Sequence, residues 1–119
     1  MGPQDCHYAG DLVDGAAVLQ LFGDLATEMS IRLDGDEGLF RAYELIEFLQ
    51  PIRAGDFISA QATVIAIGNS SRKFRFDAFK EVSLDPDRGA TAGRVLPEPT
   101  LVAFAVGTTV TPRDRQKVG

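Results

Sequence analysis

The sequence contains one cysteine, no tryptophan and fewer basic than acidic side chains, and each shortage narrows the possible functions. Because Cys6 is the only cysteine, the chain cannot close an internal disulfide or build a Cys/His metal cluster, which is typical of a reducing compartment. Twelve basic against 17 acidic side chains give a net charge of -5, which disfavours nucleic acid and anionic membranes as partners. No apolar run approaches the roughly 20 residues that span a bilayer. We therefore expect a cytoplasmic protein that binds no metal, nucleic acid or membrane.

The length and the hydrophobic content indicate a single folded domain. A chain of 119 residues with 45% hydrophobic content has material for one core. It contains no internal repeat and no low-complexity tract. We therefore treat residues 1–119 as one domain and locate its elements from hydrophobic periodicity.

One long helix is predicted from Gly15 to about Arg32. Asp11 and Asp14 precede it, where a carboxylate accepts hydrogen bonds from the first N–H groups and suits the positive end of the helix dipole. Apolar residues recur within it at three- and four-residue spacing, as one face of an amphipathic helix requires. They are Val18, Leu19, Phe22, Leu25, Ala26 and Met29.

Four strands are predicted after the helix, because branched and aromatic residues alternate there with polar or small ones. Their ranges are Leu39–Leu49, Phe57–Ile67, Lys73–Val82 and Leu101–Val110. The second and third strands are expected to form an antiparallel hairpin around a Gly-Asn-Ser-Ser turn. The stretch from Ser83 to Pro99 is long for a connection, and we expect it to be mobile rather than functional. This order predicts an α+β fold, with one long helix packed on a curved antiparallel sheet.

Several segments resemble one family of enzymes over the chain to about Lys80. They are HYAGDLVDGA at 7–16, LFGDLATE at 21–28, DGDEGLFRAY at 34–43, EFL at 47–49, AGD at 54–56 and GNSSRK at 68–73. Together they are similar to the 3-aminobutyryl-CoA ammonia-lyases, which are hotdog-fold acyl-CoA enzymes. The resemblance implies a homodimer with sites between its subunits, which can assemble further. It also implies reversible loss of ammonia from a 3-aminoacyl-CoA to give a 2-enoyl-CoA, with no cofactor beyond the coenzyme A of the substrate.

Such an elimination needs a site that stabilises the enolate oxygen formed at the thioester. A helix start presents N–H groups without acceptors inside the helix, so the backbone of Gly15 and Ala16, beside Asp14, is the candidate enolate site. Glycine allows close approach of a substrate. The alternative is an ordinary helix start with no substrate.

The elimination also needs a base for the alpha proton. Asp24 and Glu28 lie four residues apart on the predicted helix, so the two carboxylates can share one wall and either can be the base. His7 is a further acid or base candidate, because its unperturbed pKa lies near working pH. The alternatives are a solvated helix face on which Glu28 pairs with Arg32, and an exposed histidine.

Coenzyme A carries phosphates, so an acidic protein that binds it needs a local basic patch. Residues 69–73 provide polar and basic groups for this role, and the resemblance favours them as the coenzyme A site. They are Asn69, Ser70, Ser71, Arg72 and Lys73. The alternative is a charged hairpin turn whose serine hydroxyl groups close the turn.

Two other functions remain open. A hotdog acyl-CoA thioesterase or hydratase would use the same carboxylates to direct water. A non-catalytic acyl-CoA-binding protein is the third hypothesis, because position 11 is Asp11 where the resemblance leads us to expect asparagine. Negative charge at Asp11, Asp14, Asp24 and Glu28 favours the lyase, since the substrate of a lyase carries an ammonium group.

Overall fold

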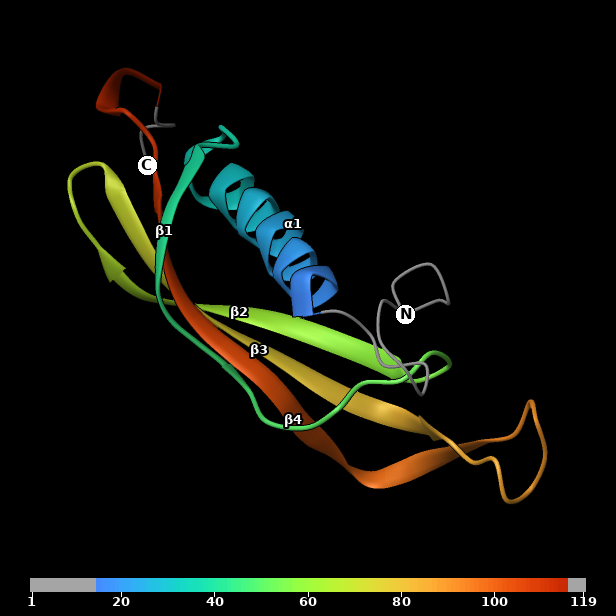
Figure 1. The fold of residues 1–119 in the computed structure, drawn as a ribbon. Coiled ribbons are helices and arrows are strands. Elements are labelled where there is room, and N and C mark those ends of the chain that lie inside the picture. The colour runs from blue at the N-terminus through green and yellow to red at the C-terminus, as the bar shows by residue number, and fades with distance from the viewer. Residues whose placement is uncertain (1–14, 116–119) are drawn as a thin grey trace.

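The computed structural model describes residues 15–115 of the chain, in which one helix lies across a four-stranded sheet (Figure 1). The helix α1 spans Gly15–Asp34, and the strands are β1 (Leu39–Phe48), β2 (Phe57–Ile67), β3 (Ser71–Leu84) and β4 (Gly93–Val110), before a short 3-10 helix at Arg113–Arg115. The sheet order is β1-β4-β3-β2, and every neighbouring pair is antiparallel. The predicted α+β architecture is confirmed.

The helix follows the predicted apolar stripe and extends two residues beyond the predicted end. Its buried residues recur every fourth position and are Val18, Phe22, Ala26, Ser30 and Asp34. The helix ends where Gly35 takes a positive φ of 71° and donates its N–H to the carbonyl of Ile31 at 2.8 Å. Glycine is favoured in this position because a side chain would be strained there.

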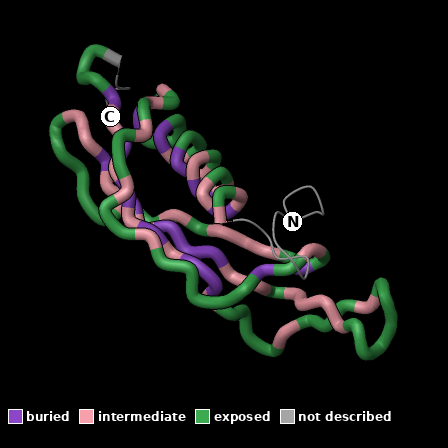
Figure 2. The backbone as a smooth tube through the Cα atoms, viewed as in Figure 1, coloured by how far each residue is buried: buried purple, intermediate pink, exposed green. Residues whose placement is uncertain are grey.

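The core lies between α1 and the middle of the sheet (Figure 2). Phe22 of the helix stacks on Phe76 of β3 with ring centroids 5.4 Å apart. Burying one such side chain contributes about 1.5–3 kcal/mol. Beside them, the alanines Ala78, Ala103 and Ala105 are buried, and their small size lets the helix backbone approach the sheet.

The prediction of a mobile connection from Ser83 to Pro99 is wrong. Strand β3 continues to Leu84, which pairs with Gly93, and the connecting loop is reduced to residues 85–92. The hairpin extends away from α1 (Figure 1). Pro97 and Pro99 lie in a register irregularity of this hairpin, where the five steps from Val95 to Thr100 on β4 oppose the two steps from Lys80 to Val82 on β3. A bulge tolerates proline because it needs no N–H there.

One buried carboxylate joins the β1–β2 connection to β3. Asp56 accepts hydrogen bonds from the backbone N–H groups of Arg53 and Leu84, both at 2.9 Å, and pairs with the ammonium of Lys80 at 3.0 Å. Burial alone would raise its pKa, but these donors outweigh burial, and the pKa of Asp56 lies below its usual value. The charged carboxylate of Asp56 therefore anchors the β1–β2 connection to β3.

Candidate functional site

The start of α1 contacts the end of β1. A Cβ atom placed on Gly15 would lie 3.0 Å from Cζ of Phe48, so the aromatic ring occupies the space beside the first helical turn. Gly15 and Ala16, the backbone of the predicted enolate site, form the start of the first turn, at the positive end of the helix dipole. The predicted enolate site is a helix start with an aromatic wall.

The two predicted carboxylates line one groove on the side of the helix. Asp24 and Glu28 share a hollow of about 200 Å³ with Leu21, Leu25 and Ala60. Both carboxylates belong to exposed residues, and Glu28 also pairs with Arg32 at 3.1 Å. The fold thus brings the two candidate bases together, and it contains the alternative ion pair as well.

The candidate bases and the enolate site of one chain cannot meet at one substrate. A rise of 1.5 Å per residue places Asp24 about 13–14 Å along the axis from Gly15. Nine residues make about two and a half turns, so Asp24 also points to the opposite side of the helix. If both act in one reaction, they belong to different copies of the chain.

The predicted coenzyme A turn lies at the other end of α1, about 28 Å from Gly15 by helix rise. Within it, the guanidinium of Arg72 is buried and bonds twice to the carboxylate of Asp34, at 2.9 and 3.1 Å. The same side chain donates to the carbonyls of Gly68 and Ser71. Arg72 therefore anchors the turn to the helix end, with most of its donors already used.

The neighbouring basic residues have partners of a different kind. Lys73 pairs with Glu44 at 2.7 Å, and the two side chains are 40% and 55% exposed to solvent. Arg75 lies over the ring of Phe104, 4.5 Å from its centroid, and also pairs with Asp77. Exposed pairs contribute little to stability, so Lys73 can exchange its partner for a phosphate at small cost.

Three other predicted residues, His7, Asp11 and Asp14, lie outside the described residues. Within the described range, 15–115, no group of three or more His, Cys, Asp or Glu side chains is placed to hold a metal ion. No helix within residues 15–115 has a long enough apolar stretch to cross a membrane.

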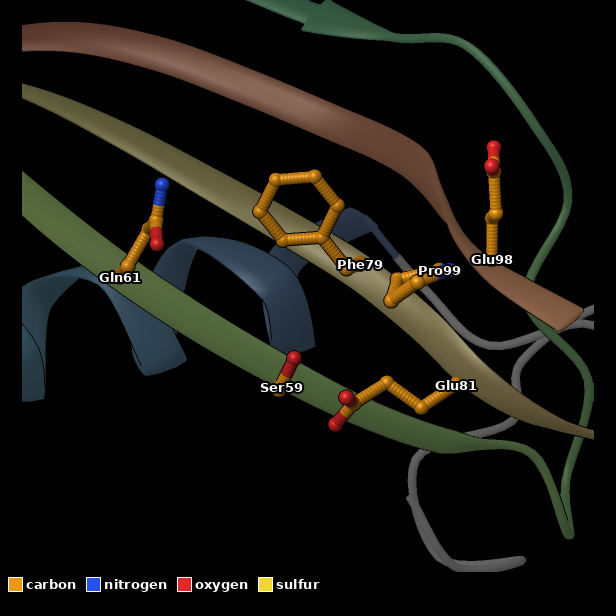
Figure 3. A pocket seen from close by; sticks show the side chains of 6 residues that line it. All are labelled: Ser59, Gln61, Phe79, Glu81, Glu98 and Pro99. Carbon is orange, nitrogen blue, oxygen red and sulfur yellow. The ribbon is translucent and has the colours of Figure 1, made fainter. Parts of the chain in front are cut away.

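A larger groove, of about 460 Å³, lies apart from every predicted site residue. Its lining comes from β2, β3 and β4 (Figure 3) and consists of Ser59, Gln61, Phe79, Glu81, Glu98 and Pro99. Ser59 and Gln61 alternate along β2 with Ile58 and Ala60, which pack against the core beneath α1. The larger groove therefore opens on the face of the sheet away from the helix. Because the predicted carboxylates and the helix start lie on the other face, we assign the site to the helix side.

Sequence reasoning missed Phe48 as a site residue. It placed this residue in a strand, where an aromatic side chain needs no further explanation. The contact with Gly15 depends on where the helix crosses the sheet, which periodicity does not report. No local sequence pattern indicates that Gly15, at the helix start, contacts Phe48 at the end of β1.

Comparisons with known proteins identify the family of the chain. Residues 12–85 match the model of the thioesterase superfamily. A 3-aminobutyryl-CoA ammonia lyase of Acetoanaerobium sticklandii is 49% identical over 117 residues, which cover 98% of this chain and 93% of that protein. The solved structure of the beta-alanyl-CoA:ammonia lyase from Clostridium propionicum is 34% identical, with a TM-score of 0.91, covering 98% of this chain and 83% of that one.

A more distant solved structure shares the fold alone. A hexameric hotdog fold thioesterase of Campylobacter jejuni is 20% identical, with a TM-score of 0.73, covering 98% of this chain and 82% of that one. The chain belongs to the thioesterase superfamily and has the hotdog fold, as the resemblance implied. Within that superfamily, the relatives from Acetoanaerobium sticklandii and Clostridium propionicum are both ammonia lyases.

Proposed function

We propose that this protein is a carbon-nitrogen lyase that eliminates ammonia from a 3-aminoacyl-CoA thioester, reversibly, to give a 2-enoyl-CoA. The observation that carries the proposal is the similarity to two ammonia lyases over 98% of the chain. The carboxylate groove on α1 supports it, because negative charge attracts a substrate ammonium.

The reaction assigns one role to each part of the site. A carboxylate, Asp24 or Glu28, takes the proton from C2, and the electron pair of the C–H bond moves toward the thioester. The N–H groups of Gly15 and Ala16 hold the resulting enolate oxygen. The enolate then forms the C2=C3 double bond while the C3–N bond breaks, and the ammonium group on C3 leaves with the electron pair of that bond as neutral ammonia. His7 and Asp14, which lie outside the described residues, are proposed as further catalytic groups.

Each active site is proposed to use two subunits of a homodimer. The helix geometry supports this, since Gly15 and Asp24 of one chain point away from each other. Both β1 and β2 are edge strands among residues 15–115, and each exposes large aliphatic side chains to a partner: Leu39 and Leu45 on β1, and Ile65 and Ile67 on β2. Dimers of this kind can assemble further.

Coenzyme A is proposed to contact the turn at residues 69–73, carried by the second subunit. Asn69, Ser70 and Ser71 offer polar groups, and Lys73 offers an ammonium whose present pairing with Glu44 is solvent-exposed. Arg72 contributes by holding the turn against Asp34 rather than by binding phosphate freely. No cofactor is required beyond the coenzyme A of the substrate. A cytoplasmic location fits the single cysteine and the acyl-CoA substrate.

Mixed dimers test the two-subunit site. We expect Asp24→Asn and Gly15→Val subunits each to be inactive alone. In a one-to-one mixture after reassociation, half of the dimers are mixed and each contains one intact site, so about a quarter of wild-type ammonia release returns. A site built within one subunit would recover nothing. If Glu28 is the base, the same recovery is expected with Glu28→Gln in place of Asp24→Asn.

Product analysis separates the lyase from the second candidate, a thioesterase or hydratase of the same superfamily. With 3-aminobutyryl-CoA, we expect ammonia and enoyl absorbance to rise together and free thiol to stay constant. Release of free thiol would identify a thioesterase. Tight binding of coenzyme A with no product of any kind would identify a non-catalytic binding protein.

A further inference from the structure

An exposed aromatic ring stands beside the proposed enolate site. Phe48 is 54% exposed, although it is large and apolar, and its ring lies against Gly15 at the start of α1. A thioester carbonyl held by the first helical turn would therefore place its acyl chain close to this ring. The exposed part of the ring is available to contact that chain.

The surroundings of Phe48 are made of small side chains. Residues directly opposite on neighbouring strands share one face of the sheet. The row that crosses the sheet at this level runs from Phe48 through Ala103 and Ala78 to Ala60. Phe48 is thus the one bulky side chain in this row of described residues, and its size limits the space that the row leaves beside the helix start.

The glycine at the helix start fits the same interpretation. A side chain at position 15 would meet the Phe48 ring at 3.0–3.4 Å, tighter than ordinary contact. With glycine, the ring packs directly against the helix backbone, so it cannot move further toward the helix to make room for a longer acyl chain.

We infer that Phe48 is a specificity-determining residue of the proposed lyase, which packs against the substituent on C3 of the substrate and restricts the enzyme to short 3-aminoacyl groups. This inference rests on the proposed function. A methyl group at C3, as in 3-aminobutyryl-CoA, packs on the ring, whereas a propyl group, as in 3-aminohexanoyl-CoA, collides with it. One methylene in an apolar pocket changes discrimination by about 10–200-fold.

The test compares kcat/KM for 3-aminobutyryl-CoA and 3-aminohexanoyl-CoA in Phe48→Ala and in wild type. We expect the ratio to shift toward the longer substrate by at least about tenfold. Both substrates are measured on the same preparation, so a reduced folded fraction cancels from the ratio. Phe48→Leu, which removes less volume, is expected to give a smaller shift in the same direction.

Phe57→Ala is the matched control. Phe57 is also a highly exposed aromatic residue, but it begins β2, which forms the edge of the sheet opposite to β1. Its ratio should equal that of wild type. An unchanged ratio in both Phe48 variants, or an equal loss for both substrates, would overturn the specificity role while leaving the lyase intact. A wild-type protein that releases no ammonia would overturn both.

Discussion

Removing the charge of Asp34 should destabilise the protein strongly, because its carboxylate balances a buried guanidinium. The side chains of Arg72 and Asp34 are only 7% and 5% exposed, and two hydrogen bonds join them. Asp34→Asn keeps the shape but turns an NH2 group toward a donor. Breaking a buried pair costs about 3–5 kcal/mol, and relief of an unfavourable charge at the helix C-terminus offsets about 0.3–1 kcal/mol. We expect a net loss of about 3 kcal/mol.

Urea unfolding at a fixed protein concentration measures this loss. With a slope of about 1.5 kcal/mol/M, a loss of about 3 kcal/mol lowers the midpoint by about 2 M. Glu44→Gln is the control, because the Lys73–Glu44 pair is solvent-exposed and its loss should cost less than about 1 kcal/mol. Replacing both buried partners, with Asp34→Leu and Arg72→Met, should recover part of the stability. A loss below about 1 kcal/mol in Asp34→Asn would refute the reasoning.

Three further predictions concern other parts of the fold. Folding lowers the pKa of Asp56 below its usual value of 3.8, so its carboxylate stabilises the protein above pH 3.8, and this stability is lost as the pH falls through the lower folded pKa. Asp56→Asn should therefore be destabilised at pH 7. In acid, its urea midpoint should converge with that of wild type. Gly107→Ala should lose about 1–3 kcal/mol in the same assay, since a Cβ would lie 2.6 Å from Cζ of Phe40; wild-type stability would contradict this overlap. Asp24→Asn and Glu28→Gln should differ in kcat, the base losing orders of magnitude with unchanged circular dichroism, and wild-type rates in both would exclude the groove as the source of the base.

Local patterns predicted most of the fold, because α1 and β2 each carry a period that needs no distant partner. The connection from 83 to 99 was mispredicted for a physical reason. Proline breaks a regular ladder, but the register irregularity that accommodates Pro97 and Pro99 is created by pairing between β3 and β4, which no single segment reveals.

The candidate site was less predictable, because its residues depend on contacts between distant segments. Arg72 looked like a phosphate ligand, yet its partner Asp34 is 38 residues away at the helix end. Phe48 looked like an ordinary strand residue until the helix start was placed against it. The carboxylates of Asp24 and Glu28 were predictable as neighbours, since helical spacing alone sets their separation.

The reverse reaction tests the central claim most directly. Crotonyl-CoA is incubated with the purified protein and ammonium at neutral pH, and the thioester products are identified by mass spectrometry. The account predicts a product heavier by one ammonia, which is 3-aminobutyryl-CoA, formed with no free coenzyme A. Addition of water would identify a hydratase, and free coenzyme A a thioesterase; either result would contradict the ammonia-lyase function.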